Sequence, residues 1–163
     1  MRAGFVEFET LAAITAQLTP ANRLVCEIAL ATGLRVSDVL GLRIERLNLR
    51  PTVIEQKTGK RRRVFLGKRL LQRCKVFAGG RKSGYLFQNR DRSGAARTRQ
   101  AVFLDVRKKA AQLGVSENIT PHTFRKAYAV KLYRRYGNVL QVQKRLGHEY
   151  ITTTMLYCFA DKL

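Results

Sequence analysis

Proline and glycine divide this chain into segments of helical length, and this punctuation constrains its fold more than any other feature. Thr19-Pro20 and Thr120-Pro121 each place a capping hydroxyl before a proline at the first helical position. Gly33 suits the left-handed residue that ends a helix. The pattern predicts helices over residues 8–18, 20–33, 70–77, 99–113, 121–136 and 139–146, another that is capped by Ser37 and runs to Leu42, and a last short helix that carries Tyr157.

The segment from Thr52 onward has a different texture. TVIEQ and RRRVFL are β-branched or alternating runs, and they flank KTGK, whose Thr-Gly pair is typical of a turn. We therefore expect an antiparallel hairpin with a cationic tip. The predicted fold is mainly α with a small antiparallel β-sheet, an α+β domain in which residues 1–163 form one unit.

The charge balance points to an anionic partner. Lysine and arginine number 32 against 11 aspartate and glutamate residues, which gives a net charge of +21. Nucleic acid, an anionic membrane surface and an acidic protein are the candidates. No apolar run approaches the ~20 residues that span a bilayer, and the N-terminus lacks the pattern of a secretory signal. The membrane interpretation is therefore weak, and we expect a soluble intracellular protein.

The cysteines and histidines predict neither a disulfide framework nor a metal site. Cys26, Cys74 and Cys158 are odd in number and widely spaced, so we expect three reduced thiols. His122 and His148 are the two histidines, too few for a metal-ligand constellation without other clustered ligands. We predict no metal and no cofactor.

Several separated residues could form a chemical site. His122 and Arg125 are at i and i+3 in the first turn of a predicted helix, so both project from one face at an end that favours phosphate. Taken singly, each candidate has an ordinary interpretation: Arg35 as a solvated charge, His122 as a capping or packing histidine, and Tyr157 as a core ring. The ordered set carries the signal.

Quoted in chain order, the motifs are ATGLRVSDVLGLR, KTGK, HTFR and VQKRLGHEYITTTMLY. This series resembles the catalytic domain of the tyrosine recombinases, the phage integrase family, over nearly the whole chain. The resemblance implies site-specific DNA recombination in which strands are cut and rejoined through a covalent 3′-phosphotyrosine, without metal or ATP.

The resemblance also implies a role for each matching residue. Arg35 and Arg125 would hold the scissile phosphate. Lys57 at the hairpin tip would be the general acid, with Lys60 as its nearest competitor. The remaining assignments are His122 for proton handling and phosphate binding, His148 for a hydrogen bond to the phosphate, Tyr157 as the nucleophile and Asp38 as a buttress for the site.

Around the nucleophile we expect ordinary packing. Ile151, Met155, Leu156 and Phe159 are predicted to anchor the short helix, and Cys158 to be a small apolar filler. Most of the surplus charge is expected to follow DNA phosphates and to make binding depend on salt. The residues assigned to this task are Lys60, Arg61, Arg62, Arg63, Arg81, Lys82, Arg90, Arg92, Arg97 and Arg99.

Members of the family normally carry an N-terminal DNA-clamping domain before the first motif, and this chain has only a short segment there. We expect an isolated catalytic domain of a longer protein rather than a minimal recombinase. The expected partners are double-stranded DNA and, in a DNA-bound tetrameric synapse, other protomers. Because the chain ends soon after Tyr157, we expect a monomer without DNA, in the cytoplasm of a prokaryote or encoded by a phage or mobile element.

Two other functions remain open on the sequence alone. A type IB topoisomerase uses similar residues to nick and reseal one strand, although histidine in LGH favours the recombinase. A DNA-binding protein with a degenerate site would need only the charge and a few helices. The presence of all the candidate positions argues against that second reading.

Overall fold

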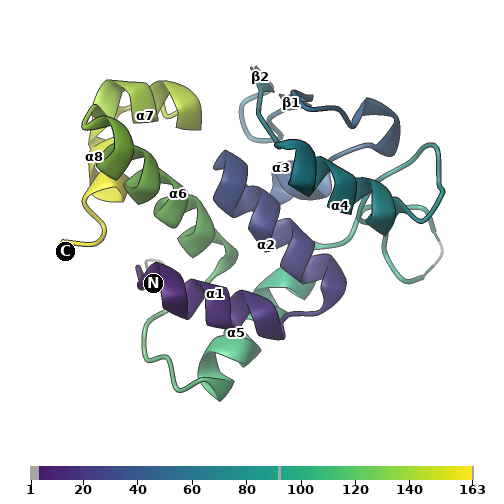
Figure 1. Cartoon of the computed structure of the whole chain (residues 1–163), viewed down its shortest axis with the longest axis horizontal. Coiled ribbons are helices and arrows are strands. Elements are labelled where there is room, and N and C mark those ends of the chain that lie inside the picture. Colours follow the sequence, from purple (N-terminus) through teal and green to yellow (C-terminus); the bar gives the residue numbers. More distant parts are fainter. Residues whose placement is uncertain (1–3, 92, 163) are drawn as a thin grey trace.

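The computed structural model describes residues 4–91 and 93–162, in which helices make up most of the fold and one small sheet lies at its edge (Figure 1). This matches the mainly helical fold with a small antiparallel sheet that the sequence predicts. The elements are α1 (Phe8–Gln17), α2 (Pro20–Thr32), α3 (Val36–Leu40), the 3-10 turn η1 (Ile44–Arg46), β1 (Thr52–Ile54), β2 (Arg61–Arg63), α4 (Lys68–Ala78), α5 (Arg99–Gln112), α6 (Pro121–Tyr136), α7 (Val139–Leu146) and α8 (Ile151–Cys158). Within the described ranges no helix has the length and apolar character needed to cross a membrane.

The predicted starts and ends of helices are confirmed where proline and glycine mark them. α2 begins at Pro20 and ends at Gly33, whose φ of 66° is left-handed. α6 begins at Pro121 behind a capping box in which Thr120 and Thr123 each satisfy a backbone N–H of the other. These caps fix where the side chains of Arg35, His122 and Arg125 leave the backbone.

The predicted hairpin is confirmed as well. β1 and β2 are antiparallel, with Thr52 opposite Arg63. Backbone hydrogen bonds extend the pairing beyond the strands, from Val64 N–H to the Pro51 carbonyl at 3.1 Å and from Glu55 N–H to the Lys60 carbonyl at 2.9 Å. The turn that follows Glu55 projects from the body of the domain and carries Lys57.

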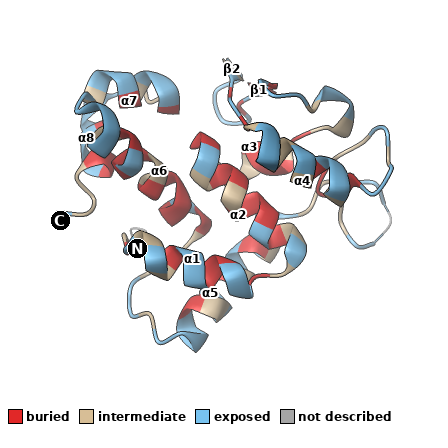
Figure 2. Ribbon diagram, viewed as in Figure 1, coloured by how far each residue is buried: buried red, intermediate tan, exposed pale blue. Residues whose placement is uncertain are grey.

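Helix α6 joins two apolar clusters. Phe124 and Ala127 lie in the larger cluster, which also takes residues from α1, α2, α4 and α5, whereas Ala129 and Leu132 lie in a smaller one with α7 and α8. α6 packs against both α2 and α8, and Figure 2 shows its buried face between them. α6 is therefore held from both sides. All three cysteines are free and buried.

The predicted start of the third helix is wrong. α3 runs from Val36 to Leu40 with Arg35 at its N-cap, so Ser37 lies inside the helix rather than capping it. Only Gly33, Leu34 and Arg35 separate the end of α2 from α3, because Gly33 turns the chain sharply enough for the next helix to begin within three residues.

The predicted anchors of α8 are also mostly wrong. Ile151, Met155 and Leu156 are 39%, 43% and 49% exposed, and Phe159 alone of the four packs against the smaller cluster. The face of α8 that is buried consists of Thr154, Tyr157 and Cys158. These positions are spaced i, i+3 and i+4, so the threonine and the tyrosine share the inward stripe that the apolar residues were expected to fill.

Gly33 offers a test of how tightly α2, α6 and α7 meet. A Cβ at this position would lie 2.4 Å from the Tyr128 ring and 2.9 Å from Leu146. The φ of Gly33 is also one that residues other than glycine rarely adopt. We expect Gly33→Ala to lower the free energy of unfolding by more than about 2 kcal/mol, as measured by urea denaturation, from backbone strain and overpacking together.

Gly114→Ala is the matched control for Gly33→Ala. Gly114 also has a positive φ, 69°, but a Cβ there would meet no atom within 4 Å. Gly114→Ala should lower the free energy of unfolding by about 1 kcal/mol, which is the contribution of backbone strain alone. Equal losses for the two variants would contradict close packing around Gly33.

Candidate active site

Arg125 is the side chain on which the candidate site is built. It is 1% exposed and projects from the first turn of α6. Its Nη1 donates to the Gly33 carbonyl and its Nη2 donates to the Leu146 carbonyl at 2.7 Å. One guanidinium therefore ties the end of α2 to the end of α7 and brings the ATGLR and LGH segments together.

Arg125 keeps hydrogen-bonding capacity beyond these two bonds. A guanidinium has five N–H donors, and the buried Nε of Arg125 has no hydrogen-bond partner among the described residues. Burial, together with the cations of Arg35 and Arg62, lowers the pKa of Arg125 to about 10. The group is still protonated at neutral pH, so it can bind an anion.

Arg35 is held by carboxylates. Its Nη1 donates to Glu55 Oε2 at 3.0 Å and lies 4.0 Å from Asp38 Oδ2. Asp38 is buried, and its Oδ1 accepts a bond from the Gln56 N–H at 2.9 Å, which fastens the hairpin to α3. The position predicted to buttress the site therefore contacts both Arg35 and the hairpin, although its functional role stays a prediction.

Glu55 is a residue of this site that the sequence reasoning missed. It is 1% exposed, and besides Arg35 it accepts a bond from Thr58 Oγ1 at 2.9 Å and lies 3.5 Å from Arg62 Nε. Burial alone would raise the pKa of Glu55, but the bonds from Thr58 and Arg35 and the charge of Arg62 outweigh it and lower the pKa. A signal existed in the sequence, since Glu55 is the one acidic residue in TVIEQKTGKRRR.

Gly147 lets the LGH segment approach this carboxylate. A Cβ added at Gly147 would lie 3.2 Å from Glu55 Oε1, and the φ of 66° again favours glycine. Glu55 therefore lies where the ATGLR, KTGK and LGH segments meet.

Tyr157 faces both histidines. Its Oη is hydrogen-bonded to His122 Nε2, and the two ring centroids are 5.3 Å apart in an edge-on arrangement. The His148 ring is also edge-on, 4.8 Å away, and its Nδ1 is 3.1 Å from Thr154 Oγ1. Tyr157 is 9% exposed, so its hydroxyl lies in a confined position against the imidazoles.

The proton affinities favour neutral groups before substrate binds. Removal from water lowers the pKa of His122 to about 4 and that of His148 to about 3, and the nearby Arg125 and Arg35 cations act in the same direction. Burial raises the pKa of Tyr157, and Arg125 and Arg35 offset it only in part. At pH 7 a neutral His122 can therefore accept the proton that a neutral Tyr157 still carries.

A cavity of about 600 Å³ opens beside this cluster, and we call it the His122 cavity. Arg35, His122 and Arg125 line it together with residues 98–100 and Phe103. The N-terminus of α6 also borders it, which adds the partial positive charge of a helix end. The composition and size of the His122 cavity suit a phosphate diester next to the Tyr157 hydroxyl.

The lysine candidates lie apart from this cluster. Lys57 is in the exposed turn two residues after Glu55, and Lys60 is exposed at the start of the returning strand. The structure thus brings Arg35, His122 and Arg125 together around one cavity and places Tyr157 against His122 and His148. Lys57 lies on the hairpin that carries Glu55.

The residues predicted to follow DNA phosphates fall into two groups. Arg62, Arg81 and Arg97 have internal partners: Arg81 donates to three backbone carbonyls and Arg97 donates to Asn22. Arg92 lies outside the described residues. The exposed members are Lys60, Arg61, Arg63, Lys82, Arg90 and Arg99.

In the parts of the chain that the structure describes, no group of three or more histidine, cysteine or acidic side chains is arranged to hold a metal ion. The charge of the site comes instead from guanidinium groups.

Comparison with known proteins gives concordant matches. The model of the phage integrase family matches residues 5–162. Tyrosine recombinase XerD of Lacticaseibacillus casei is 33% identical over 150 residues, which cover 83% of this chain and 49% of the relative. XerD of Pseudomonas aeruginosa is 34% identical over 146 residues, which cover 83% and 48%. The chain spans about half the length of the curated relatives it matches.

Two solved structures have the same fold. A XerH site-specific recombinase bound to palindromic difH substrate, in a post-cleavage complex, has a TM-score of 0.78 at 23% identity, over 98% of this chain and 50% of that chain. A lambda integrase dimer bound to a COC′ core site has a TM-score of 0.77 at 22% identity, over 97% and 48%.

The lowered pKa values of the two histidines allow a prediction of how the stability of the fold depends on pH. Folding lowers the pKa of both histidines below the ordinary value of about 6.5, so the unfolded chain binds more protons as pH falls below about 6.5. The free energy of unfolding should therefore fall between pH 6.5 and 5, by on the order of 1 kcal/mol after allowance for solvent screening. Chemical denaturation at closely spaced pH values measures this loss.

The chain makes this test clean because His122 and His148 are its two histidines. Replacing both with glutamine should abolish the slope above pH 5, before carboxylates begin to titrate. An unchanged slope in that double variant would show that other groups cause it.

Proposed function

The chain belongs to the phage integrase family of tyrosine recombinases, and from that premise we propose that it cuts and rejoins DNA strands through a 3′-phosphotyrosine at Tyr157. One observation carries the proposal: the Tyr157 hydroxyl is bonded to a neutral imidazole beside a cavity lined by two arginines. A buried tyrosine that served only packing would need neither the base nor the cations.

In the cleavage step Tyr157 Oη attacks phosphorus, and His122 Nε2 takes the phenol proton. The bond from phosphorus to the 5′ oxygen breaks as the bond to tyrosine forms. Negative charge that develops on the non-bridging oxygens is stabilised by Arg35 and by the remaining donors of Arg125. This charge stabilisation is the main contribution of the site, since the pKa of the free tyrosine is raised rather than lowered.

His148 has a supporting role in this proposal. Thr154 Oγ1 contacts its Nδ1, which leaves Nε2 as the ring nitrogen that can donate to the phosphate. A neutral histidine with the proton on Nε2 suits this role, and the lowered pKa keeps it neutral. We assign the Thr154 hydroxyl as the donor to Nδ1, which places the ring proton on Nε2. Thr154 also belongs to the buried face of α8.

The departing 5′ oxygen requires a proton, which we assign to Lys57 with Lys60 as the alternative donor. Both lie on an exposed turn, where they could reach a bound duplex. The phosphotyrosine conserves the energy of the phosphodiester, so the strand can be resealed without ATP. The 5′ hydroxyl attacks phosphorus and its proton passes back to the lysine, while the bond from phosphorus to Tyr157 breaks and His122 returns its proton to the departing phenolate.

We further propose double-stranded DNA as the substrate and strand exchange between protomers of a DNA-bound tetramer, with a monomer in its absence, acting in the cytoplasm where the DNA lies. The charge of +21 supports a polyanionic partner. The exposed cations along the hairpin and the loop before α5 supply contacts that position the backbone without reading sequence.

A nicked duplex that loses its 5′ end after cleavage tests the nucleophile. This chain should yield a protein–DNA adduct that resists detergent, and Tyr157→Phe should yield none, a loss of at least about a thousandfold on the scale of nucleophile removal. Denaturing gel electrophoresis measures the adduct. Tyr150→Phe is the control, because Tyr150 is 65% exposed at the N-cap of the same helix, away from Tyr157 in its last turn. An adduct that persists in Tyr157→Phe would refute the assignment.

A substrate with sulfur in place of the bridging 5′ oxygen tests the general acid, because a thiolate leaves without protonation. We expect Lys57→Ala to slow cleavage of ordinary DNA by about a hundredfold or more and to cleave the sulfur substrate at nearly the normal rate. Lys60→Ala should change either rate by less than about tenfold, as loss of one phosphate contact would. The reverse pattern, with rescue of Lys60→Ala, would move the assignment to Lys60.

A further inference from the structure

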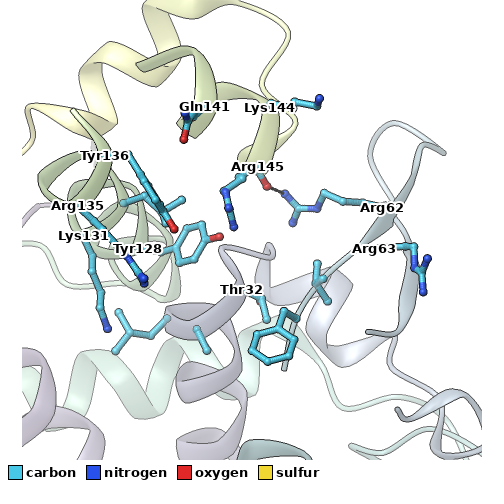
Figure 3. A pocket seen from close by; sticks show the side chains of 15 residues that line it. Thr32, Arg62, Arg63, Tyr128, Lys131, Arg135, Tyr136, Gln141, Lys144 and Arg145 are labelled. Atoms are coloured by element: carbon cyan, nitrogen blue, oxygen red, sulfur yellow. Dashed lines mark hydrogen bonds between the residues drawn. The ribbon is translucent and has the colours of Figure 1, made fainter. Parts of the chain in front are cut away.

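A second cavity, of about 620 Å³, lies between the end of α2, strand β2, and helices α6 and α7 (Figure 3). It shares no lining residue with the His122 cavity. Its wall carries six basic side chains and no acidic one, and we call it the basic cavity. The six are Arg62, Arg63, Lys131, Arg135, Lys144 and Arg145.

Most of the charges in this wall are oriented by groups other than carboxylates. Arg62 and Arg145 come together from β2 and α7, but Arg62 Nη1 donates to the backbone carbonyl of Arg145, at 2.5 Å (Figure 3). The guanidinium groups of Arg135 and Arg145 lie over the Tyr136 ring, 5.3 Å and 5.4 Å from its centroid. A carbonyl and an aromatic face orient these cations without cancelling their charge.

Arg62 has an acidic partner, Glu55, and that carboxylate is shared with Arg35. Among the described residues no carboxylate lies within ion-pair distance of the other five basic side chains. The buried Nη2 of Arg62 also has no hydrogen-bond partner among the residues that the structure describes. Like charges gathered around a cavity repel one another, so an anion that enters it gains a favourable interaction with each.

The size and charge of the basic cavity limit the anion. Its volume is in the range of small-molecule sites, about 300 to 1,000 Å³. Matching several cations in that space requires a ligand with several charges on few atoms. Linked phosphate groups meet this requirement, whereas a peptide would have to bring one acidic side chain per charge. A second copy of this chain, at +21, is disfavoured by repulsion.

We propose that the basic cavity binds a run of linked phosphate groups, from a nucleotide polyphosphate or from the backbone of a single nucleic-acid strand. Guanidinium forks of Arg62 and Arg145 suit phosphate oxygens, and Lys131 and Lys144 add point charges at the rim. Phe65, which is 59% exposed and also lines the cavity, offers a ring face to a base. This site does not depend on the proposed recombinase reaction, because none of its residues belongs to the His122 cavity.

Inorganic tripolyphosphate is the first probe, titrated calorimetrically into the whole chain at 0.15 M salt, where contacts between distant exposed charges are screened. The test variant is Lys131→Gln with Arg135→Gln. Both side chains are exposed on a helix, where glutamine is well tolerated, so the fold should be kept. The control is Lys75→Gln with Lys108→Gln, which removes the same charge from exposed positions on α4 and α5.

We expect the dissociation constant to rise at least about tenfold in the test variant and less than about twofold in the control. Amide NMR shifts should change at Thr32, Tyr128 and Arg145 on addition of the probe, and not along α5. Equal weakening in both double variants, or shifts spread over all basic surfaces, would overturn the proposal. The same titration with ATP and with a four-nucleotide single strand distinguishes the two sources of linked phosphates, a nucleotide polyphosphate and a nucleic-acid backbone. The ligand that the cavity binds naturally should have a lower dissociation constant than tripolyphosphate.

Discussion

The arrangement of the site depends on one buried cation. The C-terminal carbonyls of a helix have no partner within that helix, and they carry the negative end of its dipole. Arg125 meets such carbonyls of two helices at once, Gly33 at the end of α2 and Leu146 in the last turn of α7. A buried charge is costly when it is left alone, and this one is compensated by hydrogen bonds and by two helix ends. The segments that hold Arg35 and His148 are brought together as a result.

The electrostatics of this arrangement separate two tasks. Burial raises the pKa of Tyr157 and lowers that of His122, so the hydroxyl and its acceptor are both uncharged until a phosphate is present. If the arginines ionised the tyrosine in the free protein, their positive charge would already be partly compensated by the phenolate. They would then stabilise the negative charge of the transition state less. The cations here stay directed at the cavity, where charge develops during the reaction, which is where electrostatic stabilisation accelerates it.

Much of this was predictable from sequence, for identifiable reasons. The starts of α2 and α6 follow from Thr-Pro pairs whose effect is local, and the hairpin follows from its turn residues. Local rules failed where tertiary packing decides. Ser37 has capping chemistry, but the turn at Gly33 starts α3 earlier, and α8 buries Thr154 and Tyr157 while Met155 faces outward. No periodicity reports that Arg125 would be buried or that Arg81 would bind carbonyls, because these contacts join distant segments.

Glu55 shows what the motifs leave out. A motif-based reading assigns roles to cations and to the nucleophile, yet cations at this density need a counter-charge that fixes their geometry. One carboxylate serves Arg35 at 3.0 Å and Arg62 at 3.5 Å, and it is buried under Gly147. Since Arg35 lines the His122 cavity and Arg62 lines the basic cavity, the Glu55 carboxylate contacts one lining residue of each cavity. A carboxylate in that place cannot be lost without leaving two arginines to repel each other in a partly buried setting, where such repulsion is strongest.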